Sequence, residues 1–201
     1  DPNNLDIATQ EVQFLLEQKN FKDAEIKANE LLKTKQTGSS ARVLLAKAQA
    51  EQGKFEQALE TLAAAIEENP NDNTLALENI KIKKVREGTE AVLPELITLA
   101  EKSPNDPAIL TALTDWLIQT NRLEKAAETA QTILKIIPDQ PDVHLMLGRL
   151  QRKNGQLDQA IAHLSDAIAI DPNCVEAYLE LGKTYQERRD LEKAISIFQK
   201  G

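Results

Sequence analysis

Few side chains in this sequence could do chemistry. The chain of 201 residues contains two histidines, His144 and His163, and one cysteine, Cys174. Histidine and cysteine are common zinc ligands and common catalytic groups. Their separations of 19 and 11 residues match no zinc-binding spacing such as Cys-x-x-Cys or two histidines at i and i+4. We therefore expect no metal site, with His144 packed in a partly buried position and His163 facing solvent.

Other catalytic patterns are also missing from the sequence. It has no glycine-rich phosphate loop, no Gly-x-Ser-x-Gly nucleophile turn and no cysteine with a placed base. Carboxylates are numerous, but Glu67, Glu68, Asp158 and Glu192 are expected near helix ends or on outer faces. The one tryptophan, Trp116, is expected in the core because large aromatic side chains dominate buried contacts. The sequence thus predicts a protein that is not an enzyme and carries no cofactor.

The overall charge argues against several classes of partner. Thirty-two acidic and 24 basic residues give a net charge of -8, so long-range electrostatics repel nucleic acids and anionic lipid surfaces. No run of eighteen apolar residues could span a bilayer. A single cysteine suits the cytosol and the periplasm alike, with the cytosol slightly favoured. Because the chain begins at Asp1 without an initiator methionine, we expect a processed form or a piece of a longer protein.

A period of 34 residues organises the chain, which indicates a repeat architecture. Proline recurs at this step at Pro70, Pro104, Pro138 and Pro172. Alanine recurs at the same step, with one valine, at Ala24, Ala58, Val92, Ala126, Ala160 and Ala194. With units counted from Leu5, we expect repeats at 5–38, 39–72, 73–106, 107–140 and 141–174, followed by a truncated repeat at 175–201.

Each unit is expected to form two antiparallel helices. In the fifth unit, Leu147 and Leu150 lie at helical spacing, and Gly155 follows, where glycine can end a helix in a left-handed conformation. A second apolar stripe then runs to Asp171-Pro172, which stops a helix. Because a helix pair of this length cannot bury both apolar faces by itself, each pair must stack on the next. The recurring alanine lets the two helices of a pair approach closely.

The sixth unit carries a family motif with the order aromatic, Leu-Gly, aromatic, Ala and Phe. Its residues are Tyr178, Leu181, Gly182, Tyr185, Ala194 and Phe198. The pattern resembles the tetratricopeptide repeat. The resemblance implies an all-α solenoid, a right-handed superhelix of antiparallel helix pairs whose first helices line a concave groove that holds peptides or partner proteins. The RNA-binding pentatricopeptide repeats fit less well because their period is 35 and their charge is usually basic.

The first helices predict what the groove contains. Positions two, five, nine, twelve and thirteen of each unit should face the concave side, and position nine is basic in four of six units. The expected groove cations are Lys47, Lys81, Lys84, Arg149, Arg152 and Lys183, with Lys153 at position thirteen. The expected aliphatic contacts are Val43, Leu77, Leu145 and Leu179. Such a wall would suit an acidic segment with apolar residues. The other interpretation is that these cations are ordinary solvated charges.

One known groove chemistry of the family is absent. A carboxylate clamp for chaperone C-termini needs a set pattern of lysine, asparagine and arginine over three consecutive units, and no three units here provide it.

The third unit is degenerate, because Pro94 falls inside its second helix, where proline costs about 3 kcal/mol. We expect this helix to begin late, between Thr89 and Val92, or to kink at Pro94.

The function predicted from the sequence is a non-catalytic scaffold that binds a peptide or a partner-protein segment. One alternative is the substrate-recruiting region of a larger enzyme, which the full-length gene would reveal. A second alternative is self-assembly through the last helix, where no later helix of this sequence covers Leu191, Ile195 and Phe198.

Overall fold

A computed structural model describes residues 2–33 and 39–201, and this part of the chain consists of twelve α-helices without a strand. The end of the first expected repeat, residues 34–38, lies outside the described residues. The helices are α1 (Pro2–Glu17), α2 (Phe21–Leu32), α3 (Ser39–Glu51), α4 (Phe55–Glu68), α5 (Asn73–Glu87), α6 (Thr89–Lys102), α7 (Pro107–Gln119), α8 (Leu123–Ile136), α9 (Pro141–Lys153), α10 (Leu157–Ile170), α11 (Val175–Glu187) and α12 (Leu191–Phe198). None of these helices is long and apolar enough to cross a membrane.

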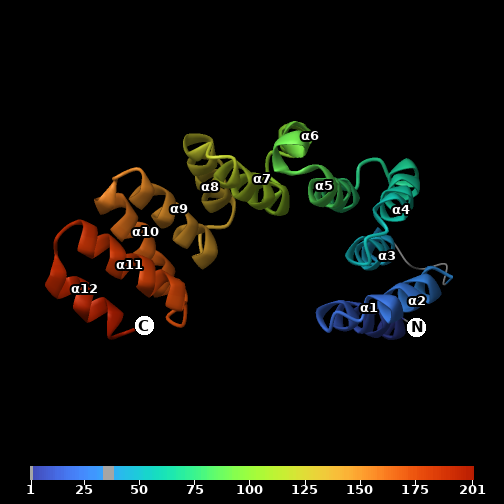
Figure 1. Cartoon of the computed structure of the whole chain (residues 1–201), viewed down its shortest axis with the longest axis horizontal. Coiled ribbons are helices and arrows are strands. Elements are labelled where there is room, and N and C mark those ends of the chain that lie inside the picture. Colours follow the sequence, from blue (N-terminus) through green and yellow to red (C-terminus); the bar gives the residue numbers. More distant parts are fainter. Residues whose placement is uncertain (1, 34–38) are drawn as a thin grey trace. The chain divides into compact units, whose positions relative to one another are not determined.

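The helices follow one another as antiparallel pairs, each joined by a short turn (Figure 1). The chain divides into two compact units, Asp1–Ser103 with α1 to α6 and Pro104–Gly201 with α7 to α12. Within each unit, the second helix of a pair packs on the first helix of its own pair, and α2, α4, α8 and α10 also pack on the first helix of the next pair. This stacking gives each unit a continuous apolar core, as expected for an all-α solenoid.

The recurring alanine lies where the two helices of a pair come closest. It is at most 2% exposed wherever it occurs, and Val92 in the third pair is fully buried too. In the fifth pair the backbones are so close that a Cβ on Gly148 would lie 2.5 Å from Cγ of Leu164. Leu164 is itself fully buried, and such a side chain contributes roughly 1.5–3 kcal/mol to stability. Small residues on one helix therefore make room for large residues on the other.

The turn inside a pair has the same conformation in most pairs. One residue per turn has a positive φ of 57–76°, and these residues are Lys19, Gly53, Asn121, Gly155 and Arg189. In the fifth pair, Gly155 N–H donates to the Arg152 carbonyl at 3.0 Å and Gln156 N–H donates to the Gln151 carbonyl at 2.8 Å. This bonding closes a helix C-terminus in the Schellman arrangement. The left-handed position expected at Gly155 is thus confirmed.

The third pair departs from this pattern. Helix α6 starts at Thr89, inside the expected range of Thr89 to Val92, with Pro94 near its beginning on an exposed side. Thr89 is also the position at which the other second helices start, so α6 is not shortened. The difference is in α5, which continues to Glu87, so that Gly88 alone separates the two helices. Gly88 has φ 89° and ψ 162°, a region that is essentially restricted to glycine. In the third pair, Gly88 alone therefore makes the change of direction for which the other pairs use a longer turn.

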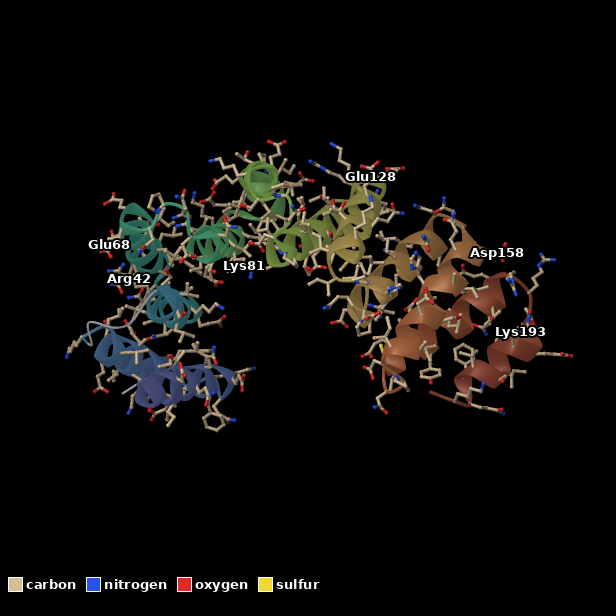
Figure 2. All side chains as sticks on the ribbon, turned by 180° about the vertical axis from the view of Figure 1, so that it is seen from behind. Arg42, Glu68, Lys81, Glu128, Asp158 and Lys193 are labelled. Atoms are coloured by element: carbon tan, nitrogen blue, oxygen red, sulfur yellow. The ribbon has the colours of Figure 1, made fainter. Side chains whose placement is uncertain are left out.

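Ion pairs on the outer surface join neighbouring helices. The Arg42 guanidinium on α3 donates two hydrogen bonds to the Glu68 carboxylate on α4, at 2.5 and 2.8 Å (Figure 2). The bonds from Arg42 lower the pKa of Glu68. Arg188, directly after α11, donates one hydrogen bond to Asp158 on α10, at 2.8 Å. Exposed ion pairs of this kind contribute only about 0–1 kcal/mol each. The two helices of a pair are therefore held together mainly by their apolar contacts.

We expect Gly88→Ala to lower the free energy of unfolding by roughly 1–3 kcal/mol. Nothing lies within 4 Å of the added Cβ, so the cost would come from backbone strain alone. Chemical denaturation of the whole chain would measure it. The control is Glu87→Ala at the neighbouring exposed position, which should cost less than about 0.5 kcal/mol. Equal effects of the two substitutions would contradict the strain at Gly88.

Candidate functional site

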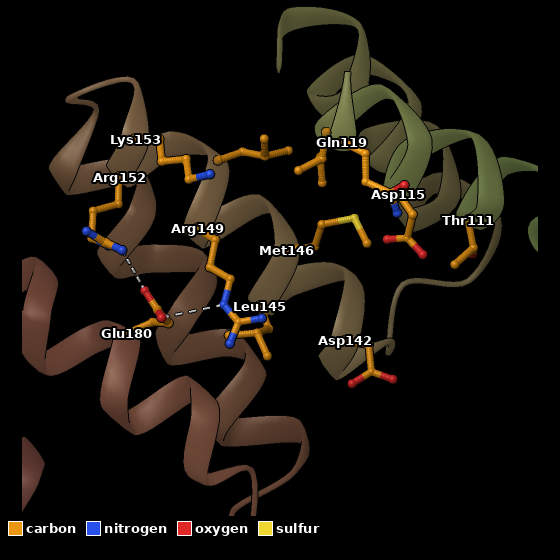
Figure 3. Close-up of a pocket in the computed structure, with 12 residues that line it drawn as sticks. Thr111, Asp115, Gln119, Asp142, Leu145, Met146, Arg149, Arg152, Lys153 and Glu180 are labelled. Carbon is orange, nitrogen blue, oxygen red and sulfur yellow. Dashed lines mark hydrogen bonds and ion pairs between the residues drawn. The ribbon is translucent and has the colours of Figure 1, made fainter. Parts of the chain in front are cut away.

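A pocket of about 590 Å³ lies on the first helices of the unit Pro104–Gly201 (Figure 3). Helix α9 packs closely on α11, whereas α7 and α9 are further apart, and the pocket occupies the space between them. The lining residues are Thr111, Asp115, Ile118 and Gln119 of α7, Asp142, Leu145, Met146, Arg149, Leu150, Arg152 and Lys153 of α9, and Glu180 of α11. This volume is in the range typical of ligand-binding pockets.

The floor of the pocket is apolar. Leu145 and Leu150 are buried in the unit and present only small areas to the pocket. Met146 is half-buried and projects from α9 toward α7 (Figure 3). A thioether on a flexible side chain adapts to ligands of different shape. The floor can therefore accept an apolar side chain of a partner.

The wall of the pocket carries both signs of charge. Its three cations are Arg149, Arg152 and Lys153, and its three carboxylates are Asp115, Asp142 and Glu180. The sequence analysis predicted the three cations of this wall as groove residues, but it did not predict that carboxylates would lie beside them. The pocket therefore offers paired charges beside an apolar floor, and no net positive field.

Glu180 forms ion pairs with three cations of the first helices. Its side chain is on α11, and the residue is only 7% exposed. Arg152 donates to Oε2 at 2.8 Å and Lys183 donates to Oε1 at 3.2 Å. Arg149 Nε lies 3.6 Å from Oε1, an ion-pair distance that is long for a hydrogen bond. Arg152 also donates to Glu187 at 2.5 Å, so its guanidinium is shared by two carboxylates.

These contacts decide the charge state of Glu180. Burial by itself raises the pKa of this carboxyl, but hydrogen bonds from Arg152 and Lys183 outweigh burial and bring the pKa below its ordinary value of 4.5. Burial likewise lowers the pKa of Arg152, and the bonds to Glu187 and Glu180 more than compensate, so that it is raised. Glu180 and Arg152 are therefore both ionised at neutral pH.

The other unit repeats this arrangement three repeats earlier in the sequence. Glu78 on α5 is 8% exposed, and it lies 3.5 Å from Lys47 Nζ on α3 and 4.0 Å from Lys81 Nζ on its own helix. Lys47 and Glu78 hold the same repeat positions as Arg149 and Glu180. Each unit thus contains one buried carboxylate that holds the groove cations of two adjacent first helices.

The structure distributes the remaining predicted groove residues unevenly. Val43, Leu77 and Leu145 are 6–7% exposed and belong to the core, so they offer a partner little surface. Leu179 is 44% exposed. Lys84 is half-buried on α5. Of the predicted groove residues, the pocket therefore brings together Leu145, Arg149 and Arg152, with Lys183 attached through Glu180.

Sequence reasoning missed the two buried carboxylates and the methionine. All three occupy position six of a unit, where the residues are Gln10, Leu44, Glu78, Ala112, Met146 and Glu180. The signal for the two carboxylates was available in the sequence. In both cases a repeat with a basic residue at position nine is followed by a repeat with an acidic residue at position six. Trp116, in contrast, is 4% exposed, as expected for a core residue.

The expectation that His163 faces solvent is wrong. His163 is half-buried, and its Nδ1 lies 3.0 Å from Nδ1 of His144. Burial and the neighbouring His144 lower the pKa of His163, while Asp166 opposes the shift. The error arises because positions four and 23 of one unit face each other across the two helices, so residues 19 apart in sequence come together.

We expect Glu180→Gln to lower the free energy of unfolding by roughly 1–3 kcal/mol at neutral pH, because Arg149, Arg152 and Lys183 lose their shared charge. A carboxyl with a depressed folded-state pKa stabilises the fold above its unfolded pKa, and this contribution is lost as pH falls through the folded value.

The difference between wild type and Glu180→Gln should therefore shrink as pH falls below 4.5, in denaturation measured over a pH series. Glu187→Gln is the control, since that side chain is 45% exposed and should cost less than about 1 kcal/mol. A difference that stays constant into strong acid would contradict the role of the ionised carboxylate.

Comparisons with known proteins agree with this architecture. A tetratricopeptide repeat family model matches residues 15–78 and 89–150, and a second model, described as TPR repeat, matches residues 148–188. No curated protein sequence matches the chain. Among solved structures, PilF from Pseudomonas aeruginosa has a TM-score of 0.74 and 16% identity, covering 98% of this chain and 89% of PilF.

Two further solved structures are similar. MamA has a TM-score of 0.68 and 18% identity, with 78% of this chain and 91% of MamA covered. YrrB, described as a TPR protein with an unusual peptide-binding site, has a TM-score of 0.66 and 16% identity, with 86% and 89% covered. At these identities the structures show the fold alone. The family models cover more than half of the sequence, and the chain therefore belongs to the tetratricopeptide repeat family.

Proposed function

We propose that this protein is a non-catalytic scaffold that binds a segment of a partner protein on the first helices of its repeats. The observation that carries the proposal is the pocket between α7 and α9, which combines an apolar floor with a charged wall. Tetratricopeptide repeats as a family are protein-interaction modules, and YrrB is described as having a peptide-binding site. A larger enzyme containing this chain would use the same pocket to recruit its substrate.

The cations of the pocket differ in their freedom to meet a partner. Arg152 is bound to both Glu180 and Glu187, so its role is structural. Arg149 Nε lies 3.6 Å from Glu180, and this nitrogen has no hydrogen-bond partner among the described residues. Lys153 is exposed on the pocket wall. Arg149 and Lys153 are therefore the cations that would receive a carboxylate of the partner.

The chemistry of the bound segment follows from this division. An apolar side chain would pack on Met146, with Ile118 and Leu145 beside it. An aspartate or glutamate close to that residue would pair with Arg149 or Lys153, which also speeds association through electrostatic steering. Asp115 and Asp142 on the same wall would disfavour segments with many acidic residues. We therefore propose an apolar segment with one or two carboxylates as the ligand, in place of a strongly acidic one.

The expected effect is that Met146→Asp and Lys153→Glu each weaken binding of peptide ligands by about tenfold or more, as for central interface residues. Peptides would be selected by the whole chain from a random library displayed on phage, synthesised, and measured by fluorescence polarisation. Circular dichroism would establish that each variant keeps its helical content.

Lys125→Glu is the matched control. It makes the same charge change at an exposed position on α8, away from the pocket, and should leave the affinity unchanged. Peptides that bind all three variants equally would show that the pocket is not the binding site. Selected peptides without any carboxylate would reject the part assigned to Arg149 and Lys153.

A second candidate function is self-association through α12. Leu191 and Ile195 on this helix are 61% and 59% exposed, and Phe198 is 40% exposed. Leu179 on the adjoining α11 adds to the exposed apolar surface. Exposed apolar patches on soluble proteins often mark interaction sites. We propose a second copy of the chain as the occupant of this face.

Sedimentation velocity over a concentration series would test the self-association. We expect the wild type to form dimers at high concentration and Ile195→Glu to remain monomeric, because a buried charge without a partner opposes association. Ser196→Glu, at the neighbouring exposed position, should still dimerise. A wild type that sediments as a monomer at every concentration would exclude this function.

A further inference from the structure

Three potential metal ligands meet on the outer side of the fifth helix pair. His144 is on α9, and His163 and Asp166 are on α10, three residues apart and thus on one face of that helix. One ligand atom from each residue lies within 4.8 Å of the other two. The two imidazole Nδ1 atoms are 3.0 Å apart, and His144 Nδ1 is 3.6 Å from Oδ2 of Asp166. No step of the proposed function uses these residues.

The hydrogen bonds of His144 orient it as a ligand. Its Nε2 lies 3.2 Å from the carbonyl oxygen of Pro138, and since that oxygen can only accept, Nε2 carries the proton. In a neutral imidazole the other nitrogen then has a free lone pair, and in His144 that nitrogen points at His163 and Asp166. Histidine ligands in metal sites are usually fixed in this way, with the second nitrogen donating to a carbonyl or a carboxylate.

The two separations from His144 Nδ1 are close to those of a tetrahedral site. Zinc binds histidine nitrogen at about 2.0–2.1 Å, so two nitrogens in a tetrahedral shell lie roughly 3.3 Å apart. The observed separations of 3.0 and 3.6 Å bracket that value. Two ring nitrogens at 3.0 Å repel each other unless a positive centre lies between them, which is either the proton of one imidazole or a metal ion.

We propose that His144, His163 and Asp166 bind one divalent transition-metal ion, with Zn²⁺ preferred. Two imidazoles and one carboxylate form a donor set that suits Zn²⁺ and neighbouring ions better than Ca²⁺ or Mg²⁺, which favour all-oxygen sites. The Asp166 side chain is 58% exposed, so water has access to the fourth coordination position. The ion would link α9, which also lines the peptide pocket, to α10.

Titration of the chain, prepared without a histidine tag, with Zn²⁺ in a calorimeter would test the site. We expect one ion per chain and no comparable binding of Ca²⁺. His144→Gln and His163→Gln should each weaken Zn²⁺ binding more than tenfold, and Asp166→Asn about tenfold, an effect at least as large as that of losing an outer-shell group. Co²⁺ should give the intense visible absorption of a four-coordinate ion in the wild type and not in the two histidine variants.

Two substitutions serve as controls. Asp158→Asn removes another carboxylate from α10 and Cys174→Ser removes the only thiol, and both proteins should bind Zn²⁺ like the wild type. A measurement on the unaltered chain covers the case in which a histidine variant does not fold: Zn²⁺ should shift the ¹⁵N resonances of both Nδ1 atoms in the wild type.

Several results would overturn the proposal. Absence of Zn²⁺ binding to the wild type, or an affinity for Zn²⁺ that is unchanged in both histidine variants, would do so. So would nitrogen resonances showing an Nδ1–H···Nδ1 hydrogen bond that is unchanged by Zn²⁺, since the positive centre between the imidazoles would then be a proton.

Discussion

The distance between the two helices of each pair is the constraint on which the other features depend. A side chain no larger than valine is buried at the same point of every second helix, and it lets the first helix approach. The glycines of the last two pairs extend this contact, because a Cβ on Gly148 or Gly182 would overlap Leu164 or Phe198. Narrow pairs stack in register, so first helices gather on one face. The pocket arises there, where α7 and α9 separate, and not from any special loop.

Buried carboxylates add a second level of order to that face. Glu78 and Glu180 are almost inaccessible to solvent, and an isolated ion at such a position would be strongly unfavourable. Each is tolerated because cations from its own helix and the preceding first helix surround it. Breaking such a buried pair costs more than the pair adds to stability. The same contacts fix the directions of these cationic side chains.

The fold was predictable from the sequence to a much greater extent than the site. Periodic properties such as the alanine track recur in every unit and confirm one another, which is why the all-α solenoid and the repeat family were correctly predicted. The site depends on residues that do not recur in every repeat. Helical periodicity placed His163 on a solvent-facing side, and it could not show that His144 on the neighbouring helix lies 3.0 Å from it. The extended α5 was missed for a similar reason, because one glycine, Gly88, replaces a turn that the other pairs share.

The shared turn also limits how a chain of this kind can change in length. Five pairs reverse direction at one left-handed residue, and a single further residue separates it from the next helix. Adding or removing a residue there would rotate the second helix by about 100° around its axis and turn its alanine away from the contact. Small insertions are thus excluded from the inside of a pair, and genes for such proteins are expected to grow or shrink by duplication or loss of whole units.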